Sequence, residues 1–214
     1  MKSSALIIIF FSLVNYACGT LEGASDQRKH VFYLHGRIIE MQGKNAVSEV
    51  FGTYEFDSIV AALNGENTVV HAEVRATDVD TREYALRMEK QIDSLIENGV
   101  VATNITVIGA SKGAIIAAHL SSFCTHTINY VFMAGNNDYQ EANNDWKFHG
   151  QVLCIYDPSD EIAGKDYSYW NNKEQLTTKF EQLALNTNLG HGFLYKPLDV
   201  WVVPVRNWIN DQQL

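Results

Sequence analysis

The chain has 214 residues, a length typical of one domain that can bury a substantial hydrophobic core. Hydrophobic residues at 46% and charged residues at 19% exclude a disordered or low-complexity protein, and no internal repeat is visible. The formal net charge is -9 and no cluster of lysine and arginine occurs, so nucleic acid is not expected as a partner.

The N-terminal segment has the pattern of a secretory signal peptide. Lys2 precedes an apolar run over residues 5–14 that is too short to span a bilayer comfortably, and small residues follow this run. Ala17 and Gly19 satisfy the small-x-small rule for cleavage after Gly19. We therefore expect residues 1–19 to be a signal peptide.

Cys18 offers a second interpretation of the same segment. A cysteine after Ala17 resembles a bacterial lipidation site, although Asn15 and Tyr16 are poor residues for the positions before it. We rank a lipid anchor at Cys18 second to simple cleavage. In either case we expect residues 20–214 to form one exported domain, periplasmic or secreted, with no membrane-spanning segment.

Apolar periodicity predicts alternating strands and helices along the rest of the chain. Predicted strands cover residues 31–34, 68–74, 105–108, 128–134, 152–156 and 179–185. Predicted helices cover residues 47–64, 81–96 and 200–209, and a further one follows Gly113. This alternation is typical of an α/β fold with a mostly parallel central sheet and helices on both faces. Functional groups in such a sheet collect at the carboxyl ends of the strands.

Residues 104–118, with the sequence NITVIGASKGAIIAA, carry the most informative motif. A β-branched run leads into Gly109, Ser111 and Gly113, and a run of small residues with helical character follows. The two glycines allow a strand and a helix to pass close to each other. A serine on such a turn is exposed at the carboxyl end of the sheet and at the N-terminus of the helix, so we expect Ser111 to be a nucleophile.

A serine nucleophile needs a base, and the base needs a group that orients it. His191, flanked by glycines after the last predicted strand, is the candidate base. The orienting carboxylate is expected at the preceding strand end, where the sequence offers Asp157, Asp160 and Glu161. We prefer Asp160 because the turn after the strand carries it outward. Asp157 is the alternative, and Glu161 ranks third.

Two backbone N–H groups are candidates for an oxyanion hole. The negative oxygen of an acyl-transfer intermediate is commonly stabilised by such donors. Arg37 follows a His-Gly pair at the end of the first predicted strand, and Lys112 directly follows the serine. Because both residues would act through their backbone, their side chains remain free for other contacts.

These motifs together make the chain resemble an α/β-hydrolase over essentially its whole mature length. The resemblance rests on Leu34-His35-Gly36-Arg37, Gly109-Ala110-Ser111-Lys112-Gly113, Ile155-Tyr156-Asp157-Pro158-Ser159-Asp160 and Gly190-His191-Gly192-Phe193. It implies Asp160 as the acid, a cofactor-independent Ser-His-Asp triad, and an acyl-enzyme intermediate. The link from Ala134 to Gly150 is too short for a helical lid, so a small, lidless, serine esterase-like member is implied.

Two further residues are candidates for contacts with the substrate. Arg75, together with Arg37 and Lys112, favours an acidic group near the ester, although Arg75 pairing with a surface carboxylate is an alternative. Trp170 follows the acid loop and is a candidate to stack on a ring, although packing within an aromatic cluster explains it at least as well. We expect no cofactor and no metal, because no metal-site spacing or phosphate-binding loop occurs.

The expected function is therefore that of an exported serine hydrolase, in particular a carboxylesterase that acts on a small-molecule ester. A non-catalytic binding protein of the same fold is the alternative from another class. A peptidase or thioesterase with the same triad is the alternative within the hydrolases.

Overall fold

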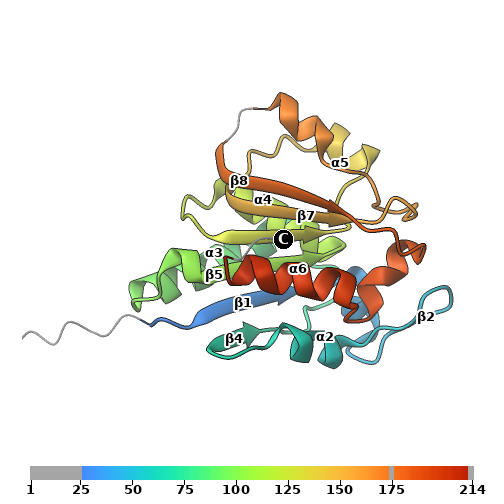
Figure 1. The fold of residues 1–214 in the computed structure, drawn as a ribbon, viewed down its shortest axis with the longest axis horizontal. Coiled ribbons are helices and arrows are strands. Elements are labelled where there is room, and N and C mark those ends of the chain that lie inside the picture. Colours follow the sequence, from blue (N-terminus) through green and yellow to red (C-terminus); the bar gives the residue numbers. More distant parts are fainter. Residues whose placement is uncertain (1–25, 174–175, 212–214) are drawn as a thin grey trace, which may run out of the picture.

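The computed structural model describes residues 26–173 and 176–211, and its centre is a parallel sheet (Figure 1). Six strands lie in the order β4-β1-β5-β6-β7-β8, and every neighbouring pair is parallel. The strands are β1 (Lys29–Leu34), β4 (Thr68–His71), β5 (Ile105–Ala110), β6 (Asn129–Met133), β7 (His149–Tyr156) and β8 (Leu176–Ala184). The prediction of a mostly parallel sheet is confirmed.

Helices cover both faces of this sheet. They are α1 (Arg37–Gln42), α2 (Phe56–Leu63), α3 (Thr81–Glu97), α4 (Lys112–Phe123), α5 (Asp138–Asn143) and α6 (Asp199–Ile209). Side chains alternate along β1, so that Val31 and Tyr33 join the core under α2 and α6, whereas Phe32 and Leu34 join the core under α3 and α4. Because residues 31–34 of β1 are buried on both faces, they form a continuous apolar run.

The segment between β1 and α2 differs from the prediction. The predicted helix over residues 47–64 is wrong in its first half, which forms a hairpin of β2 (Val47–Ser48) and β3 (Gly52–Thr53). Gly52 has a φ of 79°, which suits a tight turn and not a helix. The short helix α1, which begins directly after the turn that ends β1, is absent from the prediction because six residues are too few to establish a helical period.

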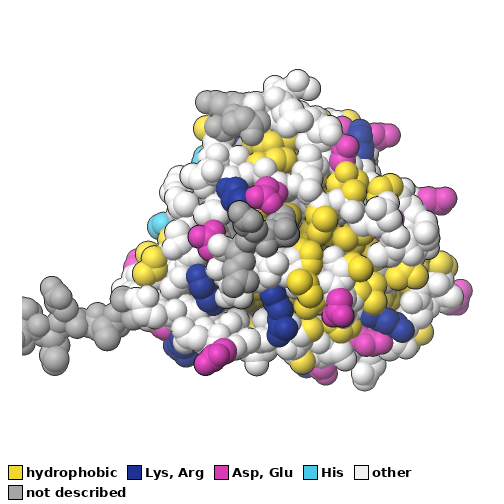
Figure 2. Space-filling model, in the orientation of Figure 1, with side chains coloured by type: hydrophobic (Ala, Val, Ile, Leu, Met, Phe, Trp, Pro, Cys, Tyr) yellow, Lys and Arg dark blue, Asp and Glu magenta, His cyan; other side chains and the backbone are white. Residues whose placement is uncertain are grey.

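Hydrophobic side chains remain exposed on the outer surface of α6. Val200 and Val203 are each 50% exposed. Figure 2 shows hydrophobic side chains gathered on this face and extending toward the end of the molecule at which the strands point.

Across residues 26–173 and 176–211, no helix has both the length and the apolar character needed to cross a membrane. The predicted signal peptide and Cys18 lie outside the described residues.

Candidate active site

Ser111 lies on a sharp turn between β5 and α4. Its φ of 54° and ψ of -118° are strained for a residue with a side chain, and such strain is concentrated at functional sites. The neighbouring glycines are required by close backbone contacts. A Cβ on Gly109 would lie 2.3 Å from the carbonyl oxygen of Gly113, and one on Gly113 would lie 1.9 Å from that of Leu34. The turn therefore holds the serine hydroxyl clear of the backbone, at the N-terminus of α4.

The structure brings Ser111, His191 and Asp160 into one hydrogen-bonded chain. His191 Nε2 lies 2.9 Å from Ser111 Oγ, and His191 Nδ1 lies 2.7 Å from Asp160 Oδ2. The other oxygen of Asp160 accepts hydrogen bonds from the N–H groups of Ile162 and Ala163. An acceptor-only carboxylate at Nδ1 places the ring proton there, so Nε2 is left to accept the serine proton.

Asp157, the alternative acid, has a different position. Its Oδ1 accepts from the N–H and hydroxyl of Ser159, and its Oδ2 accepts from the N–H and hydroxyl of Thr187. Burial alone would raise the pKa of Asp157, but these hydrogen bonds bring it below its usual value. Ser159 Oγ in turn accepts from the N–H of Gly190, 3.1 Å away. Asp157 therefore ties the loop that carries the acid to the loop that carries the base. Glu161 is exposed.

The candidate oxyanion donors begin two different helices. Arg37 is the first residue of α1 and Lys112 is the first residue of α4, and the first N–H groups of a helix have no acceptor within that helix. A Cβ on Gly36 would lie 3.5 Å from Ser111 Cβ, so the turn before α1 lies directly beside the serine. Both N–H groups therefore belong to elements that meet at Ser111.

His35 holds the turn between β1 and α1. It is fully buried, its Nδ1 donates to the carbonyl oxygen of Gly36 at 2.8 Å, and its Nε2 accepts from the N–H of Arg75 at 2.9 Å. Burial and the nearby Arg75 guanidinium lower the pKa of His35 to about 4, so the ring is neutral at physiological pH. A neutral ring with one donor and one acceptor suits both hydrogen bonds.

The structure does not place Arg75 where a substrate could contact it. Its side chain is 1% exposed and its Nε lies 2.9 Å from Glu40 Oε1. The same carboxylate binds Lys112, with 2.7 Å between Glu40 Oε2 and Lys112 Nζ. The proposed contact of Arg75 with a substrate is corrected accordingly, because this cation is used inside the protein. Sequence reasoning missed Glu40, whose one signal is a carboxylate within the short apolar segment after Arg37.

Trp170 is likewise enclosed within the protein. Its side chain is fully buried, and its ring lies 4.4 Å from that of Phe148 and 6.3 Å from that of Phe180, measured between centroids. The expectation of a stacking contact with the substrate is therefore corrected in favour of packing within the core under α3 and α4.

Two hollows of different character flank the serine. One, of 260 Å³, is lined by His191 and by Ile38, Ile162 and Leu194. The other, of 580 Å³, has charged lining residues, namely Arg37, Asp78, Asp80 and Lys112. Among the described residues, the helix between β6 and β7 is the six-residue α5, which is too short for a helical lid.

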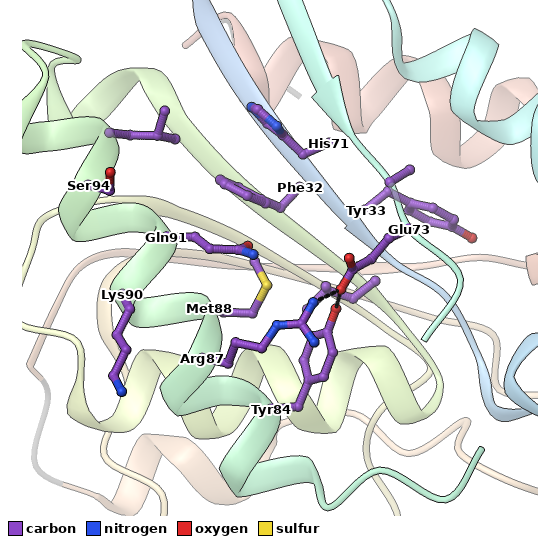
Figure 3. Close-up of a pocket in the computed structure, with 13 residues that line it drawn as sticks. Phe32, Tyr33, His71, Glu73, Tyr84, Arg87, Met88, Lys90, Gln91 and Ser94 are labelled. Carbon is purple, nitrogen blue, oxygen red and sulfur yellow. Dashed lines mark hydrogen bonds and ion pairs between the residues drawn. The ribbon is translucent and has the colours of Figure 1, made fainter. Parts of the chain in front are cut away.

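A further cavity of 590 Å³ lies between α3 and the ends of β1 and β4 (Figure 3). Phe32 and Met88 are among its apolar lining residues, and at one end Glu73 accepts hydrogen bonds from Tyr84 and Arg87. No member of the serine-histidine-aspartate chain lines this cavity. It is therefore distinct from the site where those residues meet.

No protein-family model matches the sequence, and no curated protein matches it. Solved structures do match the fold. The chain superposes on SOBER1 of Arabidopsis thaliana with a TM-score of 0.57 and 12% identity, over 86% of this chain and 98% of that one. Esterase Pf2001 of Pyrococcus furiosus gives a TM-score of 0.58 and 14% identity, over 88% and 84%.

A third solved structure also matches the fold. XC6422 of Xanthomonas campestris, described as a serine hydrolase without a lid, gives a TM-score of 0.51 and 15% identity, over 85% of this chain and 79% of that one. Identities this low show the fold. The chain has the α/β-hydrolase fold, as its motifs predicted.

Proposed function

We propose that the protein is an exported serine hydrolase that cleaves carboxylic esters. The observation that carries this proposal is the hydrogen-bonded chain from Ser111 Oγ through His191 to Asp160, built on a strained turn beside two helix N-termini. This is the arrangement that nucleophilic acyl transfer needs, with a base at the nucleophile and a carboxylate behind the base. The fold shared with an esterase and a lidless serine hydrolase agrees with the proposal.

In the proposed mechanism, Ser111 Oγ attacks the ester carbonyl carbon while His191 Nε2 takes the hydroxyl proton. Asp160 stabilises the imidazolium that results, and the N–H groups of Arg37 and Lys112 hold the carbonyl oxygen as it becomes negative. His191 then gives the proton to the alcohol oxygen, which leaves. Water repeats the sequence on the acyl-enzyme, with His191 as the base, and releases the carboxylic acid and free serine.

In this mechanism the two hollows indicate where the alcohol part and the acyl part of the ester would bind. The leaving oxygen must receive its proton from His191. Of the two hollows, the apolar one of 260 Å³ is lined by His191 and the charged one is not. We therefore place the alcohol part against Ile38, Ile162 and Leu194, and the acyl part in the larger, charged hollow. An ester with a compact apolar alcohol and a polar acyl group fits this arrangement.

The first test is covalent labelling of the mature protein with a fluorophosphonate, followed by intact mass. Activated serines form one phosphonyl adduct, so we expect one adduct in the wild type and none in Ser111→Ala. Ser94→Ala, which removes an exposed hydroxyl on α3, is the matched control and should label like the wild type. A folded wild-type protein that forms no adduct would overturn the proposal and favour a non-catalytic binding protein.

Substrate class follows from a panel of esters and thioesters. Nitrophenyl esters of rising acyl length, aliphatic esters of rising alcohol size, and matched thioesters separate an esterase from a thioesterase. The side assignment predicts that kcat/KM falls more steeply with added alcohol bulk than with added acyl bulk. The reverse order would refute it.

Export is tested on the protein recovered from its native cells. Cleavage after Gly19 predicts a mature chain that begins at Thr20, which N-terminal sequencing detects. A chain that begins at a lipid-modified Cys18 would support the anchored alternative, and a chain that retains residues 1–19 in the cytoplasm would refute export.

A further inference from the structure

A buried ionic cluster lies behind the candidate oxyanion donors. The side chain of Glu40 is fully buried between two cations, Lys112 Nζ at 2.7 Å from Oε2 and Arg75 Nε at 2.9 Å from Oε1. Arg75 is 1% exposed and Lys112 is 15% exposed. Charges withdrawn from water carry a large desolvation cost, which close contact offsets only in part. A cluster of this kind beside a candidate active site calls for a functional explanation.

The cluster joins the elements that supply the two N–H donors. Glu40 lies one helical turn after Arg37 in α1, and Lys112 is the first residue of α4. The Glu40 carboxylate therefore connects the side chain of Lys112 to α1, the helix that begins at Arg37. Arg75 adds a third tie, because its guanidinium donates to the carbonyl oxygen of His35 and its N–H donates to His35 Nε2.

We propose that Glu40 is a positioning residue, which holds the N–H groups of Arg37 and Lys112 at the spacing that a tetrahedral intermediate requires. This inference rests on the proposed function. The two donors belong to different helices, so no backbone hydrogen bond within either helix sets the distance between them. The Lys112–Glu40 and Arg75–Glu40 contacts supply that constraint. Small errors in such a geometry are costly, since a displacement of about 1 Å can reduce a rate about 100-fold.

The cluster could instead act through its charge, and the two modes make opposite predictions. Two cations and one anion give a net charge of +1 beside the oxygen that becomes negative. Glu40→Gln raises this charge to +2, which would favour an anionic intermediate and raise kcat if charge alone mattered. Glu40→Asp leaves the charge unchanged but shortens the side chain, so only the positioning role predicts a loss of activity.

The experiment compares both variants with the wild type on a soluble nitrophenyl ester. The measurements are kcat, KM, and the inhibition constant of a trifluoromethyl ketone, whose serine adduct places an oxyanion in the hole. Glu73→Gln is the matched control, because Glu73 lies in the same segment as Arg75, is about half exposed and pairs with Arg87. Thermal unfolding and circular dichroism establish which variants are folded at the assay temperature.

The positioning role predicts a fall in kcat of about 10- to 100-fold in both Glu40 variants, with KM within about twofold of the wild type. The ketone should bind more weakly by the same factor, and Glu73→Gln should match the wild type. Should Glu40→Gln fail to fold, Glu40→Asp decides alone. Folded variants with lower melting temperatures but wild-type kcat would overturn the inference, as would a rise in kcat. An inert wild-type protein would show instead that the proposed function has failed, and the inference with it.

Discussion

Asp160→Asn tests the assignment of the acid through the tautomer of the base. Asp160 Oδ1 accepts hydrogen bonds from two backbone N–H groups, those of Ile162 and Ala163, while Oδ2 faces His191 Nδ1 at 2.7 Å. An asparagine has one oxygen and one NH₂ group. The backbone donors require the oxygen at the Oδ1 position, so the NH₂ group must face His191. Because NH₂ only donates, the imidazole must present an unprotonated Nδ1 and carry its proton on Nε2.

That tautomer directs a proton at Ser111 Oγ, 2.9 Å away, and so removes the base. The equivalent substitution in a serine protease lowers kcat by about 10⁴, which corresponds to about 5 kcal/mol. We expect a loss of that order in kcat at neutral pH, with KM nearly unchanged and the fold intact by circular dichroism. A folded Asp160→Asn protein that keeps a tenth of wild-type kcat would refute this reasoning.

Asp157→Asn is the control with the same chemical change. All four hydrogen bonds to the side-chain carboxylate of Asp157 come from Ser159 and Thr187, and none comes from Ser111, His191 or Asp160. An asparagine there leaves at least one backbone N–H facing an NH₂ group, which costs about 1 to 3 kcal/mol of stability. We expect a lower melting temperature with a much smaller loss in kcat. A loss of about 10⁴ in kcat would instead place Asp157 in the triad.

Three further predictions concern stability and substrate contact. Gly113→Ala forces a methyl group to within 1.9 Å of a backbone oxygen, so we expect destabilisation by at least about 1 to 3 kcal/mol in chemical denaturation. Burial and Arg75 lower the pKa of His35 to about 4, below its unfolded value, so the free energy of unfolding should fall by about 3 kcal/mol as the pH drops from 6.5 to 4. His35→Gln should lack that component, and an unchanged pH dependence would contradict it. Trp170→Ala should lower the free energy of unfolding by about 3 to 5 kcal/mol and leave KM unchanged. A raised KM would indicate that Trp170 does contact the substrate.

The position of the candidate nucleophile could be predicted from sequence because its signal is local. The strand, the turn and the helix around Ser111 are contiguous, and the glycines are required by contacts within that unit and with β1. The candidate base and the candidate acid are brought together by long-range contacts, yet parallel strands bring their carboxyl ends to one edge and so limit the choice. Asp157 and Asp160 are only three residues apart, and separating them requires knowing the direction of each side chain, which the turn geometry decides.

The predicted substrate contacts of Arg75 and Trp170 were wrong for a different reason. Arg75 and Trp170 are residue types that often bind ligands, and sequence alone reveals neither their burial nor their partners. Arg75 is paired with Glu40, which belongs to a helix too short to be recognised from its period. Trp170 packs against Phe148, a residue more than twenty positions away. Both errors arise because tertiary contacts, and not residue type, decide which side chains remain available to a substrate.

Asp157 and Glu40 connect different parts of the candidate site. Asp157 links the acid loop to the segment before His191, and Glu40 links the helices that begin at Arg37 and Lys112. Neither carboxylate contacts Ser111, so the hydrogen bonds of either one can be weakened without removing a reacting group. The hydrogen bonds from Thr187 and Ser159 outweigh burial and keep the pKa of Asp157 below its ordinary value, so its contribution to stability is present at neutral pH and is lost as the pH falls through the lowered pKa. The connection between these two loops should therefore keep its geometry at mildly acidic pH.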